Sequence, residues 1–137
     1  MKHWFRIVIL CLFGVACQTE APPQYATPEA TLRAYQAFID NNNFEAAKAL
    51  STPAEQRRLE TMSRIIVEEA LDSSVLTTQF LKLRCEEQGD TAFCLCEVED
   101  QYERYEENYR LIRIEEKWHI DAPDEEIIIE NEVPEDR

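Results

Sequence analysis

Three cysteines are the side chains in this sequence whose types and spacing most directly indicate chemistry. Cys85, Cys94 and Cys96 lie in two runs that alternate apolar and polar residues on either side of Gly89-Asp90. Gly-Asp between two alternating runs predicts a two-residue type II′ turn with Gly at positive φ. That register places Cys85 opposite Cys94 in a non-hydrogen-bonded pair, where side chains approach most closely.

The cysteines leave three alternatives open. A Cys85–Cys94 disulfide with Cys96 free is the default expectation for an exported protein. A longer turn would shift the register toward Cys96. A metal site using all three cysteines is the second alternative, but structural zinc usually takes four ligands, and His119 falls on the opposite face of the predicted sheet. Three inert buried thiols are the third alternative. We expect no metal and no other cofactor.

Catalytic signatures are missing from the sequence. It has no Gly-x-Ser-x-Gly, no His-Glu-x-x-His and no glycine-rich phosphate loop, and it contains 2 glycines in 137 residues. An isomerase-like site would need an acid kept in an apolar cavity beside a tyrosine such as Tyr35. A cavity with no buried acid favours a binding function, whereas a buried carboxylate near Tyr35 favours an enzyme.

The first residues have the layout of a secretion signal. A basic start, Met1 to Arg6, precedes ten apolar residues, Ile7 to Ala16, and then Cys17. Gly14-Val15-Ala16-Cys17 resembles the bacterial lipobox, although that pattern prefers Leu where Gly14 stands. The resemblance implies a signal peptide at 1–16, lipidation of Cys17 and a polar tether over 17–26. The alternative is ordinary signal cleavage that leaves Cys17 as a free thiol.

The composition excludes several partner classes. Without Lys2 and Arg6, the 14 basic residues fall to 12 against 28 acidic ones, so the mature charge is −16. A chain this acidic repels nucleic acid and anionic membrane surfaces. We therefore expect attachment to the membrane through acyl chains, in the bacterial cell envelope and on its extracytoplasmic side.

Three helices followed by a meander are predicted between the tether and the tail. Thr27-Pro28-Glu29 and Thr52-Pro53-Ala54-Glu55 are helix starts, the second with capping-box spacing, and a short helix is predicted over 44–50. The strands alternate over 76–120, with Glu115-Glu116 as a tight turn and 99–108 as a hairpin end or loop. This order predicts an α+β domain over 27–121 with the helices on one face of the sheet. An acidic tail, 122–137, is expected to be mostly disordered, with Ile127-Ile128-Ile129 adding a short edge strand or packing on the domain. The alternative is a tail that docks to a partner.

The residues of three segments also suggest a family. Segments 27–35, 42–51 and 109–121 resemble small bacterial lipoproteins that carry a domain of unknown function in the nuclear transport factor 2-like superfamily. The resemblance implies a cone of helices wrapped by a curved sheet, with a cavity whose candidate lining is Tyr35, Phe38 and Trp118. That family usually has Asp-Gly where Glu115-Glu116 stand.

The superfamily holds enzymes, ligand binders and scaffolds, so the fold does not decide the function. We expect a membrane-tethered, non-catalytic module that binds a small apolar ligand or a protein. A homodimer through the sheet is a further partner to consider. The alternative function is an isomerase- or hydrolase-like enzyme that uses the cavity of the cone.

Overall fold

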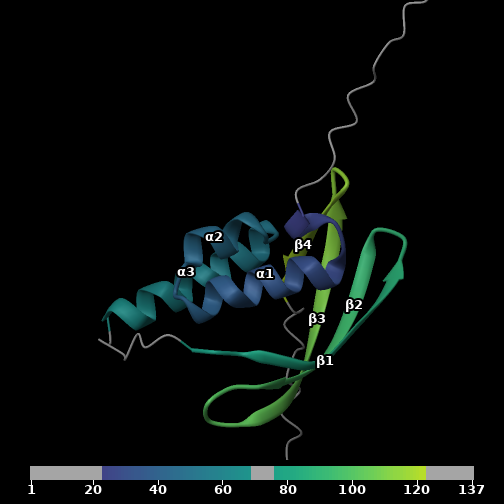
Figure 1. The fold of residues 1–137 in the computed structure, drawn as a ribbon. Helices are drawn as coiled ribbons and strands as arrows, with labels where there is room; N and C mark the ends of the chain where they lie inside the picture. The colour runs from purple at the N-terminus through teal and green to yellow at the C-terminus, as the bar shows by residue number, and fades with distance from the viewer. Residues whose placement is uncertain (1–22, 69–75, 123–137) are drawn as a thin grey trace, which may run out of the picture.

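The computed structural model describes residues 23–68 and 76–122, drawn in colour in Figure 1. The predicted signal peptide, the lipidation site Cys17 and the acidic tail from residue 123 lie outside the described residues. A short 3-10 helix, η1 (Pro23–Tyr25), precedes α1 (Pro28–Asp40), α2 (Phe44–Ala49) and α3 (Pro53–Glu68). The strands β1 (Gln79–Gln88), β2 (Thr91–Glu99), β3 (Arg104–Ile114) and β4 (Lys117–Asp121) follow. The predicted α+β order of three helices and then an antiparallel sheet is confirmed.

The predicted helix starts are also present. The Thr27 side chain accepts a hydrogen bond from the Ala30 amide at 3.1 Å, and Pro28 is the first residue of α1. Asn42, at φ 55°, stands just after the end of α1, and the Asn43 side chain caps α2 through the Ala46 amide. Short polar residues tolerate this left-handed conformation and satisfy free amides, which is why the Asn run separates two helices.

The four strands form one antiparallel sheet in the order β1-β2-β3-β4. Gly89 has φ 64°, and the turn that it starts places Gln88 opposite Thr91 and Cys85 opposite Cys94, as predicted. β3 begins at Arg104, five residues before the predicted start, so the polar segment after β2 is mostly a strand and only its tip is a loop. β4 pairs with the second half of β3 alone, from Arg110 to Ile114.

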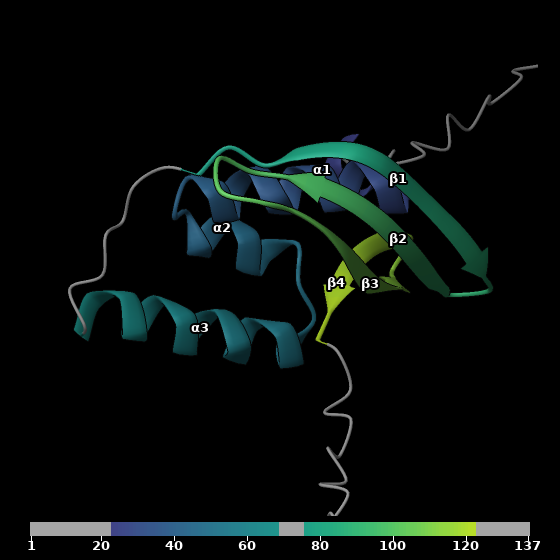
Figure 2. The same ribbon diagram turned by 90° about the horizontal axis from the view of Figure 1, so that it is seen from below.

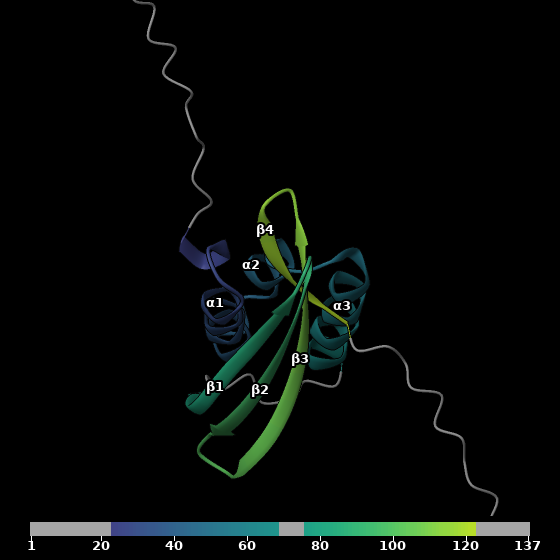
Figure 3. The same ribbon diagram turned by 90° about the vertical axis from the view of Figure 1, so that its right-hand side faces the viewer.

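All three helices lie on one side of this curved sheet, as Figures 2 and 3 show. α1 contacts β1, β2 and β4, while α2 packs between α1 and α3. The inner face of the sheet supplies most of the buried strand side chains: Ala92, Cys94, Cys96, Val98, Leu111, Trp118 and Ile120. They pack against Leu32, Tyr35, Phe44, Ala47, Leu50 and Leu59 from the helical layer. The outer face of the sheet carries no described helix.

Candidate functional site

A fully buried carboxylate lies where α3 meets α1. Glu55 is 0% exposed, and its Oε1 accepts the hydroxyl of Tyr35, which is 2% exposed. Arg58 holds the same carboxylate with two hydrogen bonds, from Nε to Oε2 at 2.8 Å and from Nη2 to Oε1 at 2.6 Å. Arg58 Nη2 also lies 3.2 Å from the Tyr35 oxygen. The three side chains therefore form one closed network of charge-assisted hydrogen bonds.

This network corrects the predicted capping box. The Thr52 hydroxyl does accept the Glu55 amide, at 3.4 Å. The Glu55 carboxylate, however, turns inward to Tyr35 and Arg58, and the Thr52 amide donates instead to the carbonyl of Ile120 at 2.8 Å. The Thr52 hydroxyl therefore caps α3 as predicted, whereas the Thr52 amide is paired by β4 and not by the Glu55 side chain. This arrangement frees Glu55 to serve as a buried charge.

A cavity of about 110 Å³ opens beside the network, between α3, the middle of β3 and the C-terminal end of β4. Its wall is mainly polar, because it is formed by Glu55, Arg58, Glu107, Asn108, Tyr109, Arg110, Ile120 and Asp121. Arg110 Nε donates to Asp121 at 2.9 Å, and the Thr52 hydroxyl donates to the other oxygen of Asp121 at 2.7 Å. The cavity is lined by three acids and two arginines, with the charges largely matched within the protein.

Burial and neighbouring acids shift several pKa values here. Desolvation and the hydrogen bond to Glu55 raise the pKa of Tyr35, and the hydrogen bond with Glu55 raises the pKa of Arg58. Desolvation and then Glu107 raise the pKa of Tyr109 well above its usual range. The pKa of Cys96 rises to about 11, chiefly through desolvation and then through Glu107. At neutral pH both tyrosines and this thiol are therefore protonated, and Arg58 is charged.

The cavity continues into an unpaired edge of β3. Ile114 and Lys117 flank a two-residue turn, so they form a hydrogen-bonded pair, and such pairs recur at every second residue. The N–H and C=O groups of Arg110, Asn108 and Glu106 consequently face the side on which β4 lies. β4 ends opposite Arg110. Asn108 and Glu106 thus present backbone groups that no described strand pairs.

The residues expected to line a cavity are mainly packing residues. Tyr35 stands one hydrogen bond behind the cavity wall, bound to Glu55. Phe38 is partly buried against the core, and Trp118 is 3% exposed under the Arg113 guanidinium, whose carbon lies 5.2 Å from its ring centre. Trp118 lies opposite Arg113, the register that the predicted tight turn at Glu115-Glu116 gives when it has two residues. Of Tyr35, Phe38 and Trp118, Tyr35 is the one that takes part in the charged network.

Cys85 and Cys94 form a disulfide in this structure, with their Cα atoms 4.0 Å apart, and Cys96 is a buried free thiol. A disulfide between two of the three cysteines removes the three-thiolate metal site considered from the sequence. Within residues 23–68 and 76–122, no group of three or more His, Cys, Asp or Glu side chains is placed to hold a metal ion.

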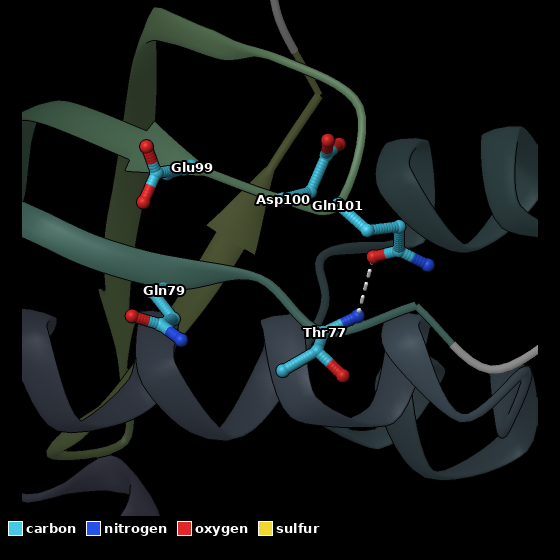
Figure 4. A pocket seen from close by; sticks show the side chains of 5 residues that line it. All are labelled: Thr77, Gln79, Glu99, Asp100 and Gln101. Carbon is cyan, nitrogen blue, oxygen red and sulfur yellow. Dashed lines mark hydrogen bonds between the residues drawn. The ribbon is translucent and has the colours of Figure 1, made fainter.

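A second hollow, of about 370 Å³, lies where β1 begins and β2 ends, opposite the turn that joins them (Figure 4). Its lining residues are Thr77, Gln79, Glu99, Asp100 and Gln101, and the Thr77 amide donates to Gln101 Oε1 at 3.1 Å across it. Asp100 Oδ1 is already engaged by the Tyr102 and Glu103 amides of its own turn. We regard this hollow as a loop cleft, because its walls are exposed and hold no buried charge.

Glu55 and Arg58 were not predicted as site residues from the sequence. The spacing of Thr52 and Glu55 is fully explained by a capping box, so the sequence offered no reason to assign the Glu55 carboxylate to a site. The available signal was Arg58, three residues after Glu55 on the same helix face, because an i,i+3 ion pair on the buried side of a helix is uncommon.

Comparison with protein-family models, with curated proteins and with solved structures found no match to this chain. Among the described helices, none has the length and apolar character needed to cross a membrane.

Proposed function

We propose that this chain is a lipid-anchored, extracytoplasmic module that binds a basic, extended segment of a partner protein without catalysing a reaction. One observation carries the proposal: the unpaired backbone edge of β3 at Asn108 and Glu106 runs directly into the charged cavity at Glu55. An extended peptide adds to such an edge through main-chain hydrogen bonds, while nearby pockets select its side chains.

The size of the cavity supports a peptide over a free small molecule. Its volume of about 110 Å³ is well below the roughly 300–1,000 Å³ typical of ligand pockets. It has room for one side chain of a segment that lies along the edge. Its polar wall also fits a charged side chain better than an apolar ligand.

The acidic residues near the unpaired edge of β3 favour a peptide that carries basic side chains. Glu106 and Glu107 lie on β3 at the unpaired edge, and Glu103 precedes the strand. The mature chain as a whole is strongly acidic, so a basic partner would also be attracted at a distance. A lysine or arginine placed in the cavity would meet Glu107.

The resemblance of segments 27–35, 42–51 and 109–121 supports a domain of the nuclear transport factor 2-like type. Three helices against a curved antiparallel sheet are compatible with such a cone.

We extend the proposal to anchoring through Cys17. Detergent-phase partitioning tests it: the protein should enter the detergent phase, and Cys17→Ser should abolish this. Equal membrane association of the Cys17→Ser protein would overturn the anchor.

Asn108→Pro tests the edge without breaking the sheet. The Asn108 amide points away from β2, so proline removes one edge donor but no bond of the β2–β3 ladder. Octapeptides selected by phage display on the lipid-free domain should alternate β-branched residues with Lys or Arg. They should bind Asn108→Ala as well as wild type and lose binding to Asn108→Pro at an unchanged melting temperature. Equal binding to both variants would contradict strand addition.

An enzyme is the second candidate, because Glu55 is a buried carboxylate beside Tyr35, the feature that an isomerase-like site requires. Both Glu55 oxygens, however, accept hydrogen bonds from Arg58, which lowers their value as a base. Native mass spectrometry of the mature domain separates the two functions. A stoichiometric small molecule that wild type converts and Glu55→Gln retains unchanged would favour the enzyme.

A further inference from the structure

The outer face of the sheet carries an apolar patch that the cavity and the β3 edge do not involve. On β2, Phe93 is 49% exposed and Leu95 is 55% exposed, and on β3 Ile114 is 43% exposed beside the half-buried Ile112. β2 is therefore apolar on both faces, although the helices cover only the inner one (Figure 3). We call Phe93, Leu95, Ile112 and Ile114 the outer apolar patch.

Basic residues stand directly across the strands from this patch. Arg84 lies opposite Leu95, Arg110 opposite Phe93, and Lys117 opposite Ile114. Among the described strand pairs, the one acid directly across from the patch is Glu86, opposite Phe93, and it pairs with Arg84 at 3.5 Å. These are 3 of the 12 basic residues outside the signal, in a chain with 28 acids. An apolar surface bordered by bases suits a segment that is apolar at its centre and acidic at both ends.

The chain contains one such segment, and it follows shortly after the end of β4 in the sequence. Asp124-Glu125-Glu126 precede Ile127-Ile128-Ile129, and Glu130 and Glu132 follow. β4 ends at Asp121, opposite Arg110, which is itself opposite Phe93. Two strand spacings are about 10 Å, whereas the six residues from Asp121 to Ile127 span up to about 20 Å.

We propose that the segment 124–132 docks on the outer apolar patch of its own chain, with Ile127-Ile128-Ile129 over Phe93 and Leu95. The flanking acids then lie near Arg84 and Lys117, while Arg110 keeps its ion pair with Asp121. This interaction is separate from the peptide site on β3, because acids continuing past β4 would lie against Glu106 and Glu107. Docking covers apolar surface that would otherwise be open to a second copy or to another protein.

Methyl NMR of the lipid-free mature chain, residues 17–137 with Cys17→Ser, tests this docking. We expect cross peaks between the methyls of Ile127-Ile128-Ile129 and the ring of Phe93, at intensities that do not change on dilution. Phe93→Ser and Ile128→Ser should each remove them, and Phe93 lies outside the buried core. Val133→Ser, which alters the apolar residue just past the segment 124–132, is the matched control and should leave them in place.

Two outcomes would overturn the proposal. Isoleucine methyls at random-coil positions in wild type would show that the segment is undocked. Cross peaks that fade on dilution, or that appear between differently labelled copies, would assign the patch to a second copy instead. Neither outcome bears on peptide binding at Asn108, so the two proposals fail independently.

Discussion

The hydroxyl of Tyr35 on α1 donates to the Glu55 carboxylate at the start of α3, and this bond joins the two helices inside the protein. Arg58 completes the network from the side of the cavity. A buried ion pair adds little net stability, because desolvation offsets its attraction, but breaking it leaves a buried charge without a partner.

Removing Arg58 should therefore destabilise the domain clearly. We expect Arg58→Ala to lower the free energy of unfolding by about 3 kcal/mol, at the low end of the range for a broken buried pair because Arg58 is half exposed. Urea denaturation measures the change. Arg57→Ala, at the adjacent exposed position, should stay within about 0.5 kcal/mol of wild type. Equal stability of the two variants would show that Glu55 does not depend on Arg58.

The domain should lose stability at alkaline pH. The folded state raises the pKa values of Tyr35 and Tyr109 above their usual value and that of Cys96 from 9.0 to about 11. Each group therefore stabilises the fold fully below its unfolded pKa, and this contribution declines as pH rises beyond it. The loss should begin near pH 9 with Cys96 and steepen above about pH 10, where unfolded tyrosines ionise.

Urea midpoints measured between pH 8 and pH 11 test this linkage. Tyr109→Phe removes one ionisation, so its stability should fall less steeply above about pH 10 than that of wild type. Tyr102→Phe is the control, because that side chain is 76% exposed, and its pH profile should follow wild type. Parallel profiles for Tyr109→Phe and wild type would contradict the prediction.

The local features of this fold were predictable, and its buried network was not. Thr27-Pro28 and Gly89-Asp90 act through neighbouring residues, so sequence analysis placed the helix start and the hairpin register correctly. The buried role of Glu55 was not predicted because its partner Tyr35 is 20 residues away in the sequence. The local sequence around Glu55 is also accounted for by a helix cap.

The early start of β3 was hidden for a related reason. Tyr105, Glu107 and Tyr109 face inward at period two, but the acid between the two tyrosines breaks the apolar alternation. From this position Glu107 lines the cavity. In both cases a charged residue on the inner side, placed by tertiary contacts, removed the signal on which sequence patterns depend.

The disulfide should stabilise the first hairpin without deciding whether the domain folds. Cys85 and Cys94 are 9 residues apart, and closing so short a loop is worth about 2–3 kcal/mol in the chain-entropy account. We expect Cys85→Ser with Cys94→Ser to fold with that loss. Peptide mapping of non-reduced protein should find Cys85 linked to Cys94 and Cys96 alkylated only after unfolding. A Cys85–Cys96 link would contradict the register.

The turn between β3 and β4 should be improvable by a single glycine. Glu115 and Glu116 have φ values of 50° and 64°, so both take the left-handed conformation of a type I′ turn. Side chains other than Gly and Asn are disfavoured there, whereas Gly adopts it at no steric cost. We expect Glu116→Gly to raise the free energy of unfolding by about 1 kcal/mol, since it relieves a strained residue despite the greater freedom of the unfolded chain. Glu103→Gly in the β2–β3 loop makes the same change where φ is not positive, so it should stabilise nothing. Urea denaturation of both variants provides the measurement, and a Glu116→Gly domain no more stable than Glu103→Gly would show that this turn is not strained.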